Sequence, residues 1–389
     1  MKLRAIFIGM FGIIAIAATV NCSSDADMPA ETSAIAADGV DSVPAQAAML
    51  ETSTTNPATG DPVNFAKDFV GVTQWLNSPP LTIEELKGKV VLVDFWTYTC
   101  INCLRTLPYL RDWHAKYASK GLVIVGVHSP EFQFEHDEDN VREAMVCERV
   151  TWPVAMDNDF DTWSAYSNRY WPNKFLIDKD GEIRYNQIGK GAYTETELHI
   201  RGYLEEAGYD VSDIPAGGVT SLDDDEPVRD KITREIYAGR GWDRGEYLGN
   251  EKPAIGELST DFNDLGDHMD GRFYLQGAWS IDRESVSHSR ATEGFEDYIA
   301  IAYEAASVNV VLRPKGIQPF KVLAPVDGKP VPADDRGDDI VVGDDGRTYL
   351  EIDGPRMYSV VRNSEIHDGE LRLHTGSPDF SLFTYTFSG

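Results

Sequence analysis

The feature that most constrains this chain is a Cys-x-x-Cys pair placed directly behind a short apolar run. Residues 90–95 read Val-Val-Leu-Val-Asp-Phe, which is typical of a buried strand, and Cys100 and Cys103 follow after four further residues. This spacing predicts that the first cysteine starts a helix, where free backbone N–H groups and the positive end of the helix dipole favour a thiolate. The second cysteine lies one helical turn further, close enough to form a disulfide with the first.

Two structural explanations compete with a redox role for this pair: a permanent disulfide, or half of a zinc site. Zinc would need two more ligands, and the sequence has no second Cys-x-x-Cys and no histidine pair at ligand spacing. We therefore expect a redox-active pair, with Cys100 as the nucleophile and Cys103 as the resolving thiol. Cys147 stands apart from the pair in an expected helix over residues 137–148. We expect it to be a small buried core residue, with a third redox thiol as the alternative.

The residues around the pair resemble the active-site segment of the thioredoxin superfamily. Asp94 lies six residues before Cys100, at the place of the buried carboxylate that in this superfamily accepts a proton from the resolving cysteine. Pro108, further along the expected helix, matches the proline that kinks the active-site helix. Arg-Tyr-Trp-Pro at residues 169–172 resembles the stretch that holds the family's cis-proline. The resemblance implies that Pro172 follows a cis peptide bond and offers extended backbone to a substrate chain.

A nearer resemblance is to the extracytoplasmic part of DipZ-type proteins. It is carried by Trp-Thr-Tyr-Thr-Cys-Ile-Asn-Cys at residues 96–103 together with residues 169–172, and it runs from about residue 65 to the C-terminus. In that family a thioredoxin-like domain precedes a β-sandwich that resembles a carbohydrate-binding module. DipZ-type proteins also carry a membrane-spanning half that delivers electrons, and we recognise no counterpart of it in this sequence. The resemblance therefore implies protein disulfides as substrates and a separate membrane electron donor of the CcdA/DsbD type.

The apolar neighbours of Asp94 favour a buried carboxylate over a solvated strand end. Burial raises the pKa of a carboxylate, so we expect Asp94 to exchange a proton with Cys103 near neutral pH. Trp96, Tyr98 and Trp171 border the expected site. Two roles stay open for these three aromatic side chains: core packing, or an exposed surface on which a substrate docks.

Thr97-x-x-Cys100 also resembles the Thr-x-x-Cys of peroxiredoxins, in which a threonine and an arginine position the peroxide. The proline expected seven residues before the cysteine is Val93 here, and a resolving cysteine three positions away fits disulfide exchange better. A thiol peroxidase is therefore the alternative among enzymes.

The N-terminus has the pattern of an export signal, with a charged start and an apolar stretch over residues 5–20. Cleavage after a small residue near its end is one interpretation, and lipid attachment at Cys22 is the other. The lone cysteine that closes the signal favours a lipoprotein, although the residues before it depart from the usual lipoprotein pattern. We expect a periplasmic or otherwise extracytoplasmic protein tethered to the membrane through Cys22.

Changes in composition divide the chain into five parts. These are a signal peptide at 1–22, a flexible tether at 23–62, a thioredoxin-like domain at 64–209, a linker at 210–228 and a β-sandwich at 230–389. In the first domain strands alternate with helices, which predicts an α/β fold with a central mixed sheet flanked by helices. The expected strands are 90–96, 122–128, 174–177 and 183–188, and the expected helices are 100–119, 137–148 and 194–207.

The second domain reads as all-β. Short runs alternate apolar with polar residues between Gly, Pro and Asp turns, which is typical of a sandwich of jelly-roll type. The runs are 272–275, 298–302, 308–313, 319–323, 357–361, 370–374 and 380–387. Aromatic residues in a sandwich usually fill the core, and stacking on a glycan is the alternative. The candidates for that stacking are Trp242, Tyr247, Trp279, Tyr298 and Tyr303.

The composition restricts partners and cofactors. The chain has 64 Asp plus Glu against 35 Lys plus Arg, a formal charge of -29, which excludes nucleic acid as a partner. The acidic turns at 334–339 and 343–346 match no EF-hand loop, and we expect solvated turns there. The histidines at 268, 288, 367 and 374 show no ligand spacing. We recognise no Gly-rich nucleotide motif, so we expect no cofactor beyond the cysteine pair.

These observations predict an exported thiol-disulfide oxidoreductase that works in the reducing direction. Ile101-Asn102 stands between the cysteines, without the histidine found in strongly oxidising relatives. The alternative from another class is a cell-surface glycan- or protein-binding protein, in which the thioredoxin-like domain is a scaffold.

Overall fold

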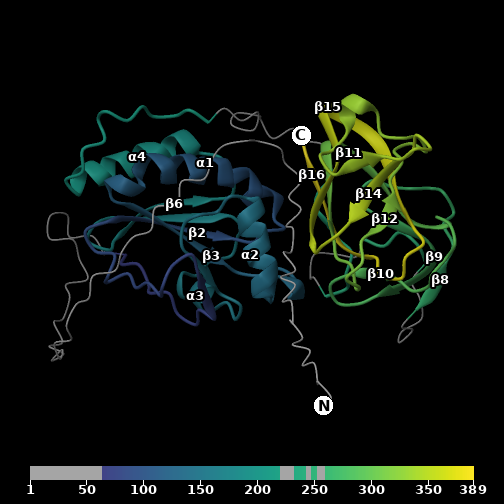
Figure 1. Ribbon diagram of the computed structural model, residues 1–389, viewed down its shortest axis with the longest axis horizontal. Helices are drawn as coiled ribbons and strands as arrows, with labels where there is room; N and C mark the ends of the chain where they lie inside the picture. Colours follow the sequence, from purple (N-terminus) through teal and green to yellow (C-terminus); the bar gives the residue numbers. More distant parts are fainter. Residues whose placement is uncertain (1–63, 220–231, 242–246, 252–258) are drawn as a thin grey trace, which may run out of the picture.

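A computed structural model describes residues 64–219, 232–241, 247–251 and 259–389. Figure 1 shows two sheets side by side, one covered by helices and one built from strands alone. The expected signal peptide, tether and Cys22 lie outside the described residues, as does the second half of the expected linker, from residue 220 onward. In the described part, no helix combines the length and hydrophobicity needed to cross a bilayer.

The first sheet is mixed and has six strands in the order β1-β4-β3-β2-β5-β6. Strands β2, β3 and β4 run parallel, and the other three pairs are antiparallel. The bounds are β1 Gln74–Leu76, β2 Val90–Trp96, β3 Leu122–His128, β4 Val154–Met156, β5 Asn173–Ile177 and β6 Ile183–Ile188. The α/β thioredoxin-like prediction is confirmed. Strands β1 and β4 went unrecognised because three residues are too short for a period to show.

Helices cover both faces of this sheet. The α-helices are α1 Ile101–Tyr117, α2 Glu138–Cys147, α3 Asp161–Ala165 and α4 Tyr193–Glu206, and the 3₁₀ helices are η1 Ala118–Lys120, η2 Gln133–His136 and η3 Ala333–Asp335. In Figure 1, α1 and α4 lie on one face of the sheet and α3 on the other. The helix predictions for α1, α2 and α4 differ from these bounds by one or two residues at each end, which is the usual fraying of helix termini.

The alternation of side chains along β2 decides what lies beneath the cysteines. Successive residues of a strand point to opposite faces of the sheet. Leu92 and Trp96 therefore share one hydrophobic layer with α1 and α4, whereas Val93 and Phe95 share the other with α3. Asp94 points to the same face of the sheet as Leu92 and Trp96. It consequently lies on the face that α1 covers, under the helix that carries Cys103.

The second sheet is antiparallel and has ten strands, which confirms the all-β prediction. The bounds are β7 Ile236–Tyr237, β8 Thr260–Phe262, β9 Phe273–Ile281, β10 Val286–His288, β11 Asp297–Leu312, β12 Phe320–Leu323, β13 Ile340–Val342, β14 Thr348–Ile352, β15 Arg356–Thr375 and β16 Ser381–Ser388. The pairings of β9, β10, β16 and β11 close into a ring. Four of the expected short runs are in fact two long strands, β11 and β15, because irregularities in their pairing let each strand continue from one run to the next.

The two sheets are joined by an aromatic interface. Phe132 and Phe134, at the start of η2, pack edge-on against Phe383 of β16 at centroid distances of 5.2 and 4.9 Å. Polar contacts surround this cluster: the Tyr237 hydroxyl donates to Glu131 at 2.6 Å. One continuous hydrophobic cluster therefore runs from α1 into the β-domain, which fixes the β-domain beside the cysteine pair.

Candidate active site

The two cysteines lie at the N-terminus of α1, as the spacing predicts. Cys100 is the N-cap residue, and its Sγ accepts a hydrogen bond from the backbone N–H of Cys103 at 3.3 Å. Both are free thiols, Cys100 partly exposed and Cys103 buried. A sulfur that caps a helix is held where the unpaired N–H groups of the first turn stabilise negative charge. Another protein can therefore reach the sulfur of Cys100, whereas only groups inside this protein can reach the sulfur of Cys103.

The loop before Cys100 is anchored by a buried carboxylate. Thr99 donates its hydroxyl hydrogen to Glu135 Oε1 at 2.5 Å, and the backbone N–H groups of Glu131 and Phe132 donate to Oε2 at 2.5 and 2.9 Å. Burial raises the pKa of Glu135, and these hydrogen bonds work in the opposite direction. Glu135 therefore ties the active-site loop to the segment that contacts the β-domain. The sequence offered no signal for this role, because Glu135 comes from a separate segment.

Asp94 is buried beneath α1, and its Oδ1 has no hydrogen-bond partner among the described residues. Burial raises its pKa from 3.8 to about 7, and the positive charge of Lys174 opposes that rise. Lys174 lies opposite Asp94 in the pairing of β2 with β5, and its Nζ donates to the carbonyl of Gly189 at 2.8 Å. Burial lowers the pKa of Lys174. A carboxyl group with a pKa near 7 can both accept and return a proton at neutral pH.

Cys103 completes the arrangement. Burial raises the pKa of its thiol well above the ordinary value, and the hydrogen bond to Cys100 and the nearby Asp94 act in the same direction. The thiol of Cys103 therefore needs a proton acceptor before it can attack, and Asp94 is a buried carboxyl group close enough to influence its charge.

Pro172 follows a cis peptide bond after Trp171. The Trp171 indole N–H donates to the carbonyl of Ser129 at 3.0 Å, and its ring packs on Trp163 with centroids 4.4 Å apart. Trp171 is partly exposed, but Trp96 and Tyr98 are buried. Trp96 and Tyr98 both pack on His128, so neither ring forms an exposed docking surface, although Tyr98 also borders the pocket between the two domains.

His128, at the end of β3, is a site residue that the sequence did not single out. It is fully buried, and burial lowers its pKa to about 3, so the ring is neutral at physiological pH. Its Nε2 lies 3.4 Å from the Thr97 hydroxyl. No described arginine contacts Thr97, so the pairing of threonine with arginine expected of a peroxidase finds no support. The sequence did carry one indication of this role: His128 is a polar residue at the end of an otherwise apolar strand.

Cys147 is not the buried core residue that we expected. It is the last residue of α2, is half-buried, and lines a pocket between the two domains. The expectation failed because the buried residues of α2 are Val141 and Met145, whereas Cys147 falls on the adjoining side of the helix.

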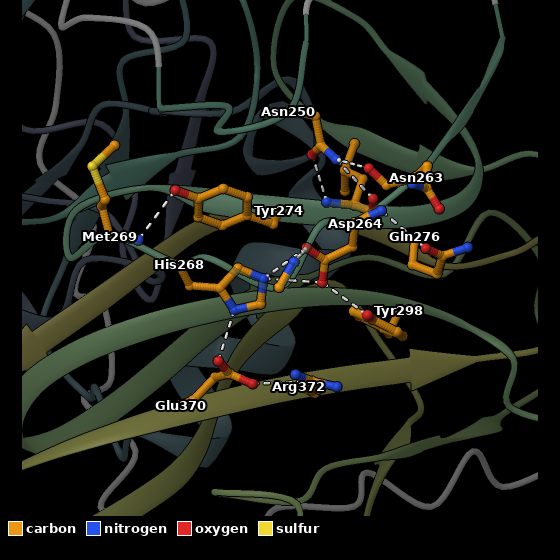
Figure 2. A network of polar contacts seen from close by, with 12 residues as sticks. Asn250, Asn263, Asp264, His268, Met269, Tyr274, Gln276, Tyr298, Glu370 and Arg372 are labelled. Atoms are coloured by element: carbon orange, nitrogen blue, oxygen red, sulfur yellow. Dashed lines mark hydrogen bonds and ion pairs between the residues drawn. The ribbon is translucent and has the colours of Figure 1, made fainter.

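One polar network of the β-domain holds its own strands together. Figure 2 shows His268 between two carboxylates, with Nε2 2.8 Å from Asp264 Oδ1 and Nδ1 2.7 Å from Glu370 Oε2. The Tyr298 hydroxyl donates to Asp264, and Arg372 pairs with Glu370. This network clamps the segment before β9 onto β15. Within the described ranges, no group of three His, Cys, Asp or Glu side chains is placed to hold a metal ion.

The aromatic candidates for glycan stacking do not form an exposed platform. Tyr247, Trp279 and Tyr303 are buried, and the half-buried Tyr298 carries Arg372 over its ring at 5.0 Å. Trp242 lies outside the described residues.

Comparison with known protein families finds two matching regions. A model described as Redoxin matches residues 59–199, and one described as Thioredoxin like C-terminal domain matches residues 233–388. The two regions coincide with the two sheets.

Among known proteins, the chain is 33% identical over 359 residues to Protein DipZ of Mycobacterium tuberculosis, covering 89% of this chain and 46% of DipZ. It therefore spans about half the length of this relative. It is 30% identical over 131 residues to Thiol-disulfide oxidoreductase ResA of Bacillus cereus, covering 34% of this chain and 70% of ResA. It is 29% identical over 140 residues to Thiol-disulfide oxidoreductase YkuV of Bacillus subtilis, covering 36% of this chain and 93% of YkuV.

Proposed function

This chain belongs to the thioredoxin-like family of thiol-disulfide oxidoreductases, and on that premise we propose that it reduces disulfide bonds of other proteins outside the cytoplasm. The observation that carries the proposal is the grouping of three residues at one helix end: the partly exposed Cys100, the buried Cys103, and the buried Asp94, whose charge acts on the Cys103 thiol.

The reaction begins at Cys100. Its thiolate attacks one sulfur of the substrate disulfide, a mixed disulfide forms, and the other substrate sulfur leaves as a thiolate that takes up a proton from water. The backbone beside Pro172 is the edge along which the substrate chain lies. The cap position of Cys100 supports this role, because its sulfur is both reachable and close to the free N–H groups of α1.

Cys103 completes the exchange. Asp94 accepts the proton of the Cys103 thiol, and the new thiolate attacks Cys100 Sγ, which releases the second substrate sulfur as a thiolate. Asp94 returns the proton to that leaving thiolate. Two electrons have then passed to the substrate, and the enzyme holds a Cys100–Cys103 disulfide. The raised pKa of Asp94, about 7, supports this role because the proton can move either way near neutral pH.

A new cycle requires two electrons from outside the chain. We assign their supply to a separate dithiol carrier in the membrane, of the CcdA/DsbD type, and no cofactor beyond the cysteine pair is needed. We assign the enzyme to the extracytoplasmic face of the membrane, with lipid attachment at Cys22 and residues 23–62 as the tether; the export-signal pattern at residues 1–20 supports this assignment.

The reduction potential of the pair tests this proposal. The protein is equilibrated in graded dithiothreitol or glutathione buffers, free thiols are trapped, and the fraction of oxidised Cys100–Cys103 is measured by mass spectrometry. We expect a value in the reducing half of the range from about -270 to about -120 mV that the superfamily spans. A potential in the oxidising half would contradict the reducing direction, and a pair that does not cycle would contradict the redox role itself.

A further inference from the structure

A pocket of about 590 Å³ lies between the two domains, beside the cysteine pair. One wall comes from Tyr98 and Leu104 and from α2, and the opposite wall from the start of β15 and the loops next to it. Leu104 is one helical turn beyond Cys100, and its backbone N–H donates to the carbonyl of Cys100. A molecule that fills this pocket therefore lies within one helical turn of the reactive sulfur.

The wall from the first domain is one continuous face of α2. Asn140, Glu143, Ala144 and Cys147 line the pocket at a spacing of three and four residues, which places them on the same side of the helix. The two buried residues of α2, Val141 and Met145, lie on the adjoining face. The pocket is thus a groove that runs along the helix and is closed by the β-domain.

The charges that line the groove are unbalanced. Six carboxylates and one arginine, Arg356, line it. Two of the carboxylates, Glu148 and Asp338, are paired with Arg111 and Arg362, which lie outside the lining. The positive charge of Arg356 is already shared between Asp339 at 2.8 Å and Asp353 at 3.2 Å. The carboxylates of Glu143 and Glu351 are exposed and form no ion pair within the described part of the chain. Lys321 lies opposite Glu351 in the sheet, but its ammonium group lies over the ring of Tyr349.

Tyr98 gives an independent indication that something binds here. It lines the groove from the loop that carries Cys100, is only 4% exposed, and its hydroxyl has no hydrogen-bond partner among the described residues. A buried hydroxyl is normally satisfied. Burial and the nearby Glu135 raise the pKa of Tyr98, so the hydroxyl stays neutral and able to donate or accept.

We infer that this acidic groove binds a positively charged segment of the substrate polypeptide and so selects disulfides that have lysine or arginine nearby. The inference rests on the proposed function. Apolar side chains, among them Leu104, Ala144 and Met357, line the groove together with the carboxylates. That combination suits lysine and arginine, whose aliphatic stems pack on apolar surface while the charged ends reach carboxylates.

A divalent cation fits the groove less well. Its carboxylates are spread over both walls, and nowhere in the described ranges do three acidic or histidine side chains converge on one point. Hard cations need several oxygen ligands within about 2.6 Å. The volume is also that of several side chains rather than of one ion.

The test compares two disulfide-linked peptides that differ only in the residues beside the disulfide, lysine in one and glutamine in the other. The pre-reduced full chain is mixed with each peptide at low salt, and thiol release is followed in a single turnover. The variants are Glu143→Gln combined with Glu351→Gln, and Glu293→Gln as the control. Glu293 is exposed, lines neither wall, and its substitution changes the net charge in the same direction.

We expect the wild type to reduce the lysine peptide about tenfold faster than the glutamine peptide, and the double variant to lower this ratio to about threefold or less. The Glu293→Gln control keeps the wild-type ratio. An unchanged ratio in the double variant, or an equal fall in the control, overturns the inference. Calcium binding by calorimetry that the double variant abolishes, without any lysine preference, also overturns it in favour of a cation site.

Hydroxyethyl disulfide, which is small and uncharged, separates the two proposals. If the reduced protein does not reduce it, the proposed function fails. If the protein reduces it but shows no preference between the peptides, only the groove assignment fails.

Discussion

Asp94 on β2 lies directly opposite Lys174 on the antiparallel strand β5, and both side chains are buried, with exposed fractions of 2% and 0%. Each group lowers the cost of charging the other, yet burial dominates: the pKa of Asp94 is raised to about 7 and that of Lys174 is lowered. The pair therefore keeps an ionisable carboxyl group under the cysteines at the cost of stability.

We expect Asp94→Asn to stabilise the protein above pH 7 and to slow turnover. The folded state holds the Asp94 proton up to about pH 7, whereas the unfolded chain loses it from about pH 3.8, so the free energy of unfolding falls as pH rises between these values. The pKa difference corresponds to about 4 kcal/mol as an upper order of magnitude. Asparagine does not ionise and avoids this loss. Urea unfolding of both proteins at pH 4 and pH 8 measures the effect, which should be small at pH 4.

The same variant should reduce substrate disulfides about 100-fold more slowly, because a positioned general base contributes at least that much. It should also lose the pH dependence centred near pH 7. Turnover with a protein disulfide between pH 5 and pH 9 checks this, and an unchanged profile would exclude Asp94 as the proton acceptor.

Lys174→Met should move the pH dependence of turnover upward. The lysine charge lowers the pKa of Asp94, so its removal raises that pKa above 7, by about one unit or more for an opposite charge at close range. The midpoint of the pH–rate profile reports the shift. Lys179→Met is the matched control, because the Lys179 side chain is 40% exposed and pairs with Asp180 at the surface, away from Asp94. A downward shift would show that Lys174 acts on Asp94 by some route other than its charge.

Cys103→Ser should trap the substrate as a mixed disulfide on Cys100. Without the buried thiol, nothing inside the protein attacks the bond between enzyme and substrate, so the adduct persists until an external thiol removes it. Non-reducing electrophoresis with mass spectrometry identifies the linked cysteine. Cys100→Ser should form no adduct at all. An adduct through Cys103 in that second variant would reverse the assigned order of attack.

Phe383→Ala should loosen the segment that holds the active-site loop. Loss of a buried phenylalanine costs about 3 kcal/mol or more, and this ring packs on both Phe132 and Phe134. Amide hydrogen exchange in residues 131–137 should then speed up by as much as about 100-fold. Phe380→Ala is the control, since Phe380 is equally buried but packs on Trp279 inside the β-domain. Equal acceleration in both variants would mean that the interface does not stabilise this segment.

Much of the first fold was predictable because its signals are local. The strands at 90–96, 122–128 and 183–188 have the predicted bounds, since each is bounded by a clear change in pattern. The polar middle of β15 concealed its continuity. The sequence shows two separate runs there, but residues 362 and 367–369 pair with β11 and keep the strand in the sheet. Local pattern carries no information about partners so distant in sequence.

The site was predictable only as far as the motif extends. Cys100, Cys103 and Asp94 lie within ten residues, but Lys174 joins them through the register of β5 against β2, which spacing along the chain does not reveal. The burial of Tyr98 and the placement of Cys147 beside a groove depend on how the β-domain docks, and no single segment encodes that.

The aromatic interface limits how this protein can be divided or recombined. The segment that presents Phe132 and Phe134 to the β-domain also supplies Glu135, which holds Thr99 next to Cys100. A version cut after α4 would leave two phenylalanines facing water beside its reactive thiol, inviting self-association. Grafting this first domain onto another protein would therefore require a replacement surface for both rings, or two polar substitutions that leave the Glu135 contact intact.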